Sequence, residues 1–323
     1  MSLTARLDGL QRRHTALGFP IAVVYKFFDD YGTYLAALIT YYAFVSLFPG
    51  LLLLTTILGF VLAGHPDLQQ QVLNSALAQF PVIGGQLGEP HRIGGGVAGL
   101  VIGTLGALYG GLGVTQAIQY AMNTAWQVPR NVRPNPLRAR ARSLLLLTTL
   151  GVALAGATLL SVLGHGAGGR VLFTVLAVVV NAVVLVVGFR LAAARDLTVR
   201  QVLPGALAAA VVWQLLQTFG GLYVSHVIRS ASATNGVFAT VLGLLAFLYV
   251  AATAMVLCTE VNVVRVERLY PRALLTPFTD DVDLTGGDER SYTGAATSQR
   301  AKGFQEIDVR FRPRRRRRPR GAG

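Results

Sequence analysis

The chain has 323 residues, of which 53% are hydrophobic and only 14% are charged, and its mean hydropathy is +0.52. Soluble domains carry about 25% charged residues, so this composition excludes an ordinary soluble domain and indicates that much of the chain faces lipid. The basic residues behind the net charge of +14 at pH 7 all lie outside the apolar stretches, so the charge mostly reflects topology and not a nucleic-acid interface. The single cysteine, Cys258, excludes an intramolecular disulfide and any paired-cysteine metal site.

A charged segment, residues 1–33, precedes the first long apolar stretch. Within it, residues 18–28 (GFPIAVVYKFF) are short and mixed in polarity, which is typical of a helix lying along the cytoplasmic face of a membrane. The apolar stretch that follows is too long for a signal-peptide core and starts too far into the chain. We therefore expect it to be retained.

Six apolar segments without Lys, Arg, Asp or Glu then follow. Each has about 19 to 29 residues, enough for a helix to cross a hydrocarbon core of about 30 Å. The sequence therefore predicts an all-α, polytopic membrane protein with six transmembrane helices in a membrane domain, residues 34–268. The predicted spans are residues 34–62, 94–115, 143–164, 171–189, 202–224 and 236–258.

Basic residues alternate between the two sides of these spans. Lys and Arg number four before the first span, five between the second and third, three between the fourth and fifth, and fourteen from residue 265 onward. Each of the other three loops has one. Because basic residues are enriched in cytoplasmic loops, this distribution predicts that the N- and C-termini are cytoplasmic.

The first span carries polar groups and a proline in the run LITYYAFVSLFPGLLLL. Tyr42, Ser46 and Pro49 are spaced i, i+4 and i+7 and therefore share one helical face. Pro49 cannot donate to the carbonyl of Val45, which predicts a kink, and Ser46 is expected to bond back to Tyr42. We predict that this face, with Tyr41, looks inward and lines a pathway. A structural kink alone is the alternative.

The second span is rich in glycine, and its small residues recur at every fourth position. Such a stripe lets helix backbones approach closely, which matters where lipid gives helices no hydrophobic reason to associate. We expect tight packing within the chain, in preference to a dimer interface. The stripe consists of Gly95, Gly99, Gly103, Ala107 and Gly111.

A polar face continues beyond this stripe, at the cytoplasmic end of the same helix. Two interpretations of it stay open: an ordinary solvated helix terminus, or the lining of an inward-facing vestibule. The face consists of Gln116, Gln119, Tyr120, Asn123 and Gln127.

Amide side chains fall near the middle of two later spans. Asn181 lies in the fourth span, and Gln214 and Gln217 share one face of the fifth. Because an amide in hydrocarbon needs a partner, these side chains must face other helices or a wet cavity. Hydrogen bonds between helices are the simpler interpretation, and a polar groove for a headgroup or a small solute is the functional one.

The last span ends in CTEVNVV, which contains Glu260 and Asn262. An acidic group at the inner interface is expected to form a structural ion pair, with Arg265 or with an arginine of a cytoplasmic loop. Ionisable residues are absent from the deeper part of every span, which argues against a proton relay or a voltage sensor.

From residue 269 the chain becomes polar and rich in Gly, Thr and Ser, which predicts a disordered cytoplasmic tail over residues 269–323. The tail ends in FRPRRRRRPR, and we expect this run to touch anionic lipid of the inner leaflet. Specific binding of nucleic acid is not expected, because Phe311 alone offers no stacking platform.

Motifs for catalysis are missing. The sequence has no phosphate-binding GxxxxGK loop, no HExxH, no GxSxG and no His and Asp cluster with metal-ligand spacing. We therefore expect no enzymatic activity, no metal site, no cofactor and no hydrolysis of ATP by this chain.

Three motifs, in the right order, resemble those of the YihY / virulence factor BrkB family. They are Tyr41-Tyr42-Ala43-Phe44-Val45-Ser46-Leu47-Phe48-Pro49, Asn123-x-x-Trp126, and Phe247-Leu248-Tyr249 followed by Glu260-x-Asn262. The resemblance covers about residues 20–268. Phe247 stands where relatives have Trp, and Cys258-Thr259 stands where Gly-Ala is common. The resemblance implies a multi-pass protein of the bacterial plasma (inner) membrane with six helices and cytoplasmic termini.

The resemblance also points to the cell envelope. Relatives are associated with virulence and serum resistance, transport of envelope lipids has been proposed for them, and an old ribonuclease label finds no support in these residues. Our hypothesis is a transporter or lipid translocase not driven by ATP, with membrane lipids as its partners. The alternative is a membrane scaffold that recruits cytoplasmic or envelope partners. The sequence indicates no oligomeric state.

Overall fold

The computed structural model describes residues 3–61, 67, 70, 96–163, 170–223, 233–280 and 282–312. Every regular element within these residues is an α-helix, which confirms the predicted all-α fold class for this part of the chain. In chain order the helices are α1 (Leu3–Arg13), α2 (Thr15–Asp29), α3 (Gly32–Val61), α5 (Gly96–Ala125), α6 (Pro136–Leu163), α7 (Arg170–Ala192), α8 (Val199–Tyr223), α9 (Ala233–Val266) and α10 (Gly286–Ser298).

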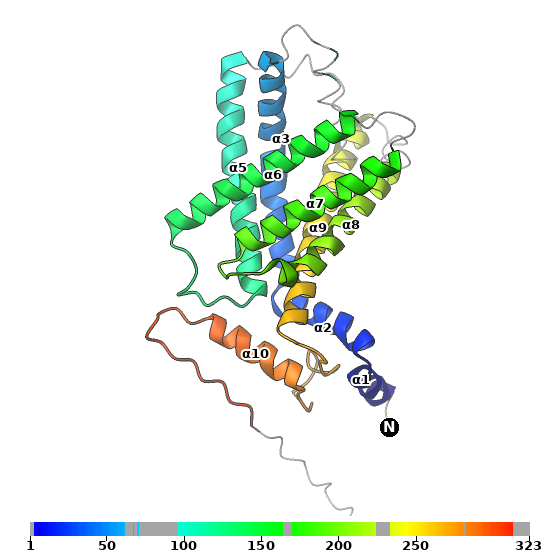
Figure 1. Cartoon of the computed structure of the whole chain (residues 1–323), viewed down its shortest axis with the longest axis vertical. Helices are drawn as coiled ribbons and strands as arrows, with labels where there is room; N and C mark the ends of the chain where they lie inside the picture. The colour runs from blue at the N-terminus through cyan, green and yellow to red at the C-terminus, as the bar shows by residue number, and fades with distance from the viewer. Residues whose placement is uncertain are drawn as a thin grey trace, which may run out of the picture.

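The long helices α3 and α5 to α9 form a bundle, and α1, α2 and α10 gather at one end of it (Figure 1). Each predicted apolar segment overlaps one of the long helices. Local signals set some of the helix ends. At the start of α6, the side chain of Asn135 accepts a hydrogen bond from the backbone N–H of Arg138 at 2.9 Å, and Pro136 takes the first helical position. Both residue types are favoured there.

Four helices of the described chain are long and apolar enough to cross a membrane. They cover Gly32–Ile57, Val97–Ala125, Val199–Gly220 and Phe238–Val266. A shorter apolar stretch, Val178–Ala192, lies in α7. This is the fold of a multi-pass membrane protein, since a helix needs about 20 apolar residues to span the hydrocarbon core.

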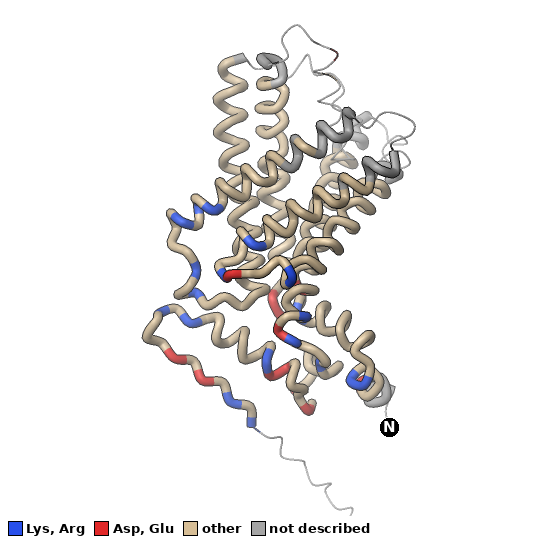
Figure 2. The backbone as a smooth tube through the Cα atoms, viewed as in Figure 1, with Lys and Arg blue, Asp and Glu red and all other residues tan. Residues whose placement is uncertain are grey.

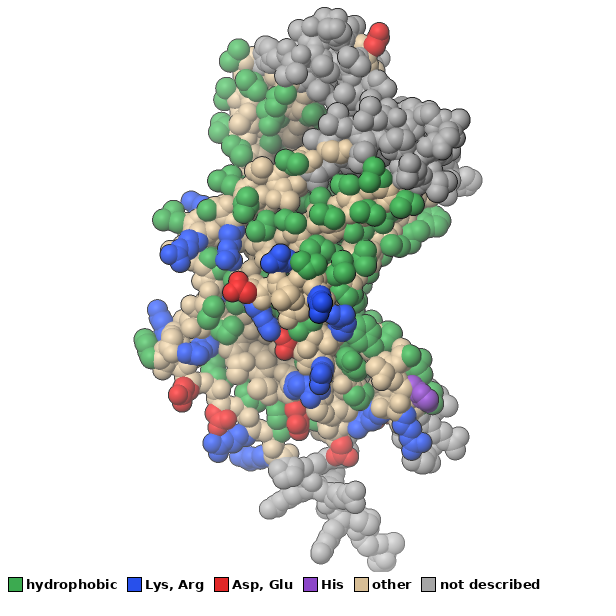
Figure 3. Space-filling model, in the orientation of Figure 1, with side chains coloured by type: hydrophobic (Ala, Val, Ile, Leu, Met, Phe, Trp, Pro, Cys, Tyr) green, Lys and Arg blue, Asp and Glu red, His purple; other side chains and the backbone are tan. Residues whose placement is uncertain are grey.

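Charged and hydrophobic side chains occupy different parts of the surface. Lys, Arg, Asp and Glu gather around the end of the bundle that carries α1, α2 and α10 and at the ends of α6 to α9 on that side, whereas the described parts of the long helices farther from this end are free of them (Figure 2). Hydrophobic side chains cover the visible face of the bundle (Figure 3). Val183 and Phe219, for example, are 58% and 62% exposed. So extensive an apolar surface suits contact with lipid and would not suit contact with water.

Helices α3 and α5 run antiparallel and make the most extensive contact between two helices in the described structure. Glycines of α5 allow this approach, because a methyl group on any of them would meet an atom of α3. Their alternating spacing of three and four residues keeps the row facing one partner along its length. The pairs are Gly113 with Tyr42, Gly110 with Ser46, Gly106 with Pro49, Gly103 with Leu53, and Gly99 with Leu52 and Thr56.

The predicted small-residue stripe is therefore correct only in part. Gly99 and Gly103 do face α3, but a row of every fourth residue drifts around a helix that has 3.6 residues per turn. As a result Gly111 faces Leu147 of α6 instead, and Ala107 is half-buried. Gly95 lies outside the described residues.

The predicted inward face of the first span is corrected in part. Helix α3 continues through Pro49 without a break, and the hydroxyl of Ser46 donates to the carbonyl of Ala43 at 2.9 Å, not to Tyr42. Ser46 and Pro49 pack against glycines of α5, so this part of the face is a packing surface. Tyr41 is 57% exposed, with its ring edge-to-face on the ring of Tyr42.

The C-terminal segment is folded where the sequence predicts a disordered tail. Helix α10 begins at a capping box in which the hydroxyl of Thr285 accepts from the backbone N–H of Asp288, while the carboxylate of Asp288 accepts from the backbone N–H of Thr285. Beyond α10 the chain is tied to the loop after α5, since the backbone N–H of Arg130 donates to the carbonyl of Ser298 at 3.1 Å. The prediction is therefore wrong for this segment. The terminal arginine run, residues 313–323, lies outside the described residues.

Candidate functional site

A pocket of about 370 Å³ opens between α3, α5 and α6 toward the end of the bundle that carries α1, α2 and α10; we call this end the inner end and the pocket the inner pocket. It brings Tyr42 of the predicted α3 face together with four residues of the predicted α5 polar face, namely Gln116, Gln119, Tyr120 and Asn123. Arg133, from the loop between α5 and α6, completes its polar lining beside Tyr120. The α5 polar face therefore lines a cavity, which favours its interpretation as the lining of a vestibule.

Two of these side chains hold the helices in place. The buried amide nitrogen of Gln119 donates to the hydroxyl of Ser143 in α6 at 2.8 Å. The side-chain oxygen of Asn123 accepts from the backbone N–H of Ala194, just after α7, at 2.7 Å. Gln116, by contrast, is exposed and lines the pocket without such a role.

Arg133 is the cation of the inner pocket. Its Nε donates to the carbonyl of Val128 at 3.1 Å, and one terminal nitrogen approaches the carbonyl of Asn123 at 3.5 Å. The guanidinium carbon lies 5.7 Å from the centre of the Tyr120 ring, within the range of a cation–π contact. Partial burial lowers the pKa of Arg133, because desolvation disfavours the charged form, and nearby Arg130 acts in the same direction.

A second cavity, of about 300 Å³, lies among α3, α6, α7, α8 and α9, and we call it the membrane cavity. Its lining is apolar apart from Asn181 and the indole N–H of Trp213. Of the three amides predicted near the middle of spans, only Asn181 lines it. Trp213 and Leu216 present the α8 face that borders the cavity, so Gln214 and Gln217 do not line it.

A buried charge cluster lies beneath the bundle, where α2 crosses under α9. Lys26 of α2 is fully buried, forms an ion pair with Asp30 and lies 3.7 Å from the carboxylate of Glu260. Its ammonium also donates to the carbonyl of Ala125 at the end of α5, at 3.1 Å. A cation is favoured there because a helix C-terminus carries partial negative charge.

The predicted ion pair of Glu260 therefore exists, but its predicted partner was wrong. Lys26 takes the place assigned to Arg265 or a loop arginine. Burial lowers the pKa of Lys26, but the carboxylates of Glu260 and Asp30 outweigh burial and raise it above the ordinary value. Burial raises the pKa of Asp30 in spite of the attraction of Lys26.

Asn262 joins α9 to the turn of α8 in which Pro204 interrupts the helical hydrogen bonds. Its side-chain oxygen accepts from the backbone N–H of Gly205 at 2.7 Å, and its nitrogen donates to the carbonyl of Val202 at 3.1 Å. Pro204, which has no N–H, leaves the carbonyl of Arg200 without its helical partner. A guanidinium nitrogen of Arg265 donates to that carbonyl at 2.8 Å. Asn262 is thus a helix-joining residue in this structure.

The Asn123-x-x-Trp126 motif also joins parts of the bundle. Trp126 is buried in the core at the inner end of the bundle, and the guanidinium of Arg195 lies over its ring at 5.4 Å. Asn123 bonds the neighbouring Ala194. Both motif residues therefore hold the segment that follows α7.

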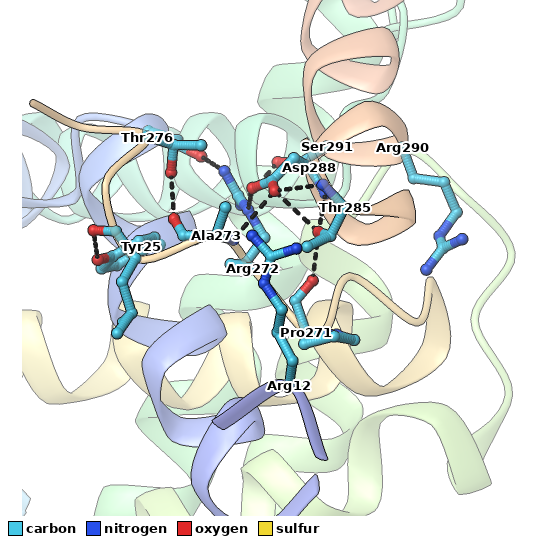
Figure 4. Close-up of polar contacts among 12 residues, drawn as sticks. Arg12, Tyr25, Pro271, Arg272, Ala273, Thr276, Thr285, Asp288, Arg290 and Ser291 are labelled. Carbon is cyan, nitrogen blue, oxygen red and sulfur yellow. Dashed lines mark hydrogen bonds and ion pairs between the residues drawn. The ribbon is translucent and has the colours of Figure 1, made fainter. Parts of the chain in front are cut away.

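A further buried polar cluster, which the sequence did not predict, is centred on Arg272 (Figure 4). This buried guanidinium donates to Asp288 of α10 at 2.5 Å, to Asp29 of α2 at 2.8 Å and to Ser291 at 3.2 Å. The capping pattern Thr285-x-x-Asp288 could have indicated α10. Nothing in the local sequence marks Arg272, because its partners lie far away along the chain.

Within the described residues, groups of three or more His, Cys, Asp or Glu side chains able to hold a metal ion are absent. The fold and these pockets define an integral, multi-pass α-helical membrane protein. A family model described as Virulence factor BrkB matches residues 23–279, so the chain belongs to this family and the resemblance seen in the sequence is confirmed. No curated protein and no solved structure matches the chain.

Proposed function

We propose that the protein is a lipid translocase of the bacterial inner membrane that is not driven by ATP and catalyses no chemical reaction. In this proposal α3 and α5 to α9 all cross the membrane, with both chain termini in the cytoplasm. The basic loops support this orientation, as does the gathering of charged residues at one end of the bundle (Figure 2).

The membrane cavity is the observation that carries the proposal. Ligand pockets in proteins have volumes of about 300–1,000 Å³, so a cavity of about 300 Å³ lies at the lower end of this range. Its apolar lining suits an acyl chain, and Asn181 offers one polar contact. Helix α3, which borders this cavity through Ile39 and Ala43 and is held against α5 by glycine contacts, would form the fixed wall along which the lipid moves.

Reconstitution into liposomes tests the proposal. The full-length protein is expected to move fluorescent phospholipids between leaflets faster than empty liposomes do. Ala251→Phe, which fills the cavity, is expected to slow this movement several-fold. Its matched control is Val250→Phe, on the neighbouring, 48% exposed position of α9 outside the cavity, which is expected to leave the rate unchanged. A wild-type rate no higher than that of empty liposomes would exclude the proposal.

The folded C-terminal segment favours one alternative, a membrane scaffold. Arg272 and α10 hold this segment against α2, where it would face the cytoplasm in the proposed topology. Truncation after residue 300 retains α10 and removes the basic tail. If the truncated and full-length proteins retain the same cytoplasmic proteins in a pull-down, the tail does not act as the recruiting element.

A further inference from the structure

We propose that the inner pocket binds the phosphate-bearing headgroup of an anionic phospholipid from the inner leaflet, with Arg133 as its main contact. The inference deepens the proposed function and rests on it for the identity of the transported lipid. Binding itself is measurable without any transport.

The arginines near the inner pocket favour the binding of an anion. The loop between α5 and α6 and the first turns of α6 carry Arg130, Arg133, Arg138, Arg140 and Arg142, while Asp and Glu are absent from residue 96 to residue 195. In the part of the chain that the structure describes, no carboxylate forms an ion pair with any of these arginines. Of these arginines Arg133 lines the pocket, and in the described residues no carboxylate pairs with its charge.

Arg133 retains donors for such an anion. A guanidinium has five N–H donors, and the two carbonyl contacts of Arg133 account for two of them. The contacts with Val128 and Tyr120 fix its position, so a phosphate would meet a preorganised group. Arginine suits this task because its planar fork can bind phosphate with two parallel hydrogen bonds.

The remaining lining explains why the anion is a lipid and not a soluble phosphate. Gln116 and Tyr42 add neutral polar contacts, whereas Leu38 brings an apolar side chain into the same pocket. Leu144 and Leu145, on the next turns of α6, are half exposed on the outer surface of the bundle. A lipid could place its phosphate on Arg133 and its chains along these leucines.

The pocket also lies at the depth that a headgroup requires. Asn123 lies in the last turn of α5, which is long and apolar enough to cross a membrane, and Arg133 follows in the loop beyond the end of this helix. Charged and polar contacts are expected at that level, where the hydrocarbon core gives way to headgroups.

Native mass spectrometry of the full-length protein in neutral detergent tests this inference. Phosphatidylglycerol, phosphatidylcholine and inorganic phosphate serve as separate probes. Phosphatidylglycerol is expected to bind more tightly than phosphatidylcholine, and Arg133→Gln is expected to weaken it about tenfold, in line with the loss of a charge-assisted contact. The matched control, Arg138→Gln, removes the same charge from the same stretch of chain at an exposed position outside the pocket and is expected to have little effect.

Several outcomes would overturn the inference. Equal weakening by Arg133→Gln and Arg138→Gln would indicate a general effect of charge. Displacement of the lipid by millimolar inorganic phosphate would indicate a site for a soluble anion. Should Arg133→Gln fail to fold, Gln116→Leu replaces an exposed pocket residue and must still weaken binding of phosphatidylglycerol. Intact lipid binding without any movement of lipid in liposomes would refute the proposed function and leave this site standing.

Discussion

At the scale of single residues, Lys26 is the cation that joins α2 to α9 and to the end of α5. It is one of only two lysines in the chain and is fully buried between two carboxylates and the end of α5. A buried ion pair contributes little compared with well-packed apolar groups, but removing one member of it leaves a charge without a partner. The position of α2 under α9 therefore depends on this ammonium.

Lys26→Met is expected to destabilise the protein by about 3–5 kcal/mol, because Asp30 and Glu260 would stay buried without a cation. Chemical unfolding of the purified protein in detergent would measure this. The other lysine supplies the control, since Lys302 is exposed and Lys302→Met should change stability by less than about 0.5 kcal/mol. Equal stability of the two variants would contradict a stabilising role for the cluster.

The same group predicts a dependence on alkaline pH. The folded state raises the pKa of Lys26 above its ordinary value of 10.5, so the resulting stability is complete below that pH. It is lost as the pH rises through the folded-state pKa. Melting curves from about pH 9 upward should show a steeper loss for the wild type than for Lys26→Met. Parallel curves would show that Lys26 is not the group responsible.

The ion pair of Glu260 shows where prediction from sequence succeeds at this scale. A carboxylate at the end of an apolar helix needs a counter-charge, so the existence of a pair was predictable. Its partner was not, because the choice between Lys26 and Arg265 depends on how α2 crosses under α9. For the same reason the sequence pointed to Asn123 and Asn262 as polar but could not show that they join helices.

At the scale of helices, the contact of α3 with α5 depends on small residues. Gly110→Val is expected to destabilise the protein by about 1–3 kcal/mol, because the new side chain would overlap Ser46. Gly151→Val, on α6, is the matched control, since a methyl group added at Gly151 would have no atom of another helix within 4 Å. Thermal unfolding in detergent would compare the two. A control as unstable as Gly110→Val would point to a general effect of valine in helices.

Helix α10 offers a second test at this scale. Asp288→Asn removes the charge that faces the buried Arg272 and is expected to release α10 from α2 and let it unfold, so that trypsin cleaves after Arg290 faster. Glu289→Gln changes the neighbouring, exposed residue and should leave the cleavage rate unchanged. Time courses of limited proteolysis would follow both variants. Equal cleavage of Asp288→Asn and wild type would show that the ion pair does not hold the helix.

Apolar length predicted the long helices well, because a segment in lipid must satisfy its backbone hydrogen bonds internally. The phase of the glycine row was harder to predict. The sequence alone favours a row of every fourth residue. The row that meets α3 includes Gly106, Gly110 and Gly113, and it becomes visible only once the pairing of the two helices is known. Helix α10 was missed because its composition is polar and its stability comes from Arg272, outside the helix.

At the scale of the whole molecule, the proposed topology is open to chemical labelling. In a Cys258→Ala background, Lys302→Cys should react with a membrane-impermeant maleimide in inside-out vesicles but not in right-side-out ones. Asp67→Cys, in the loop between the first two predicted spans, should show the opposite pattern. Labelling of both positions from the same side would refute the proposed arrangement.

Arg272 also has a consequence for the order in which the protein is made. Its partner Asp29 lies 243 residues earlier in the chain, so Asp29 leaves the ribosome long before the guanidinium that will pair with it. The clamp between α2, α10 and the segment after α9 can close only when every membrane helix has been synthesised. Closure of this contact therefore follows synthesis of the last long helix, and a nascent chain arrested before residue 272 would lack the cation that pairs with Asp29.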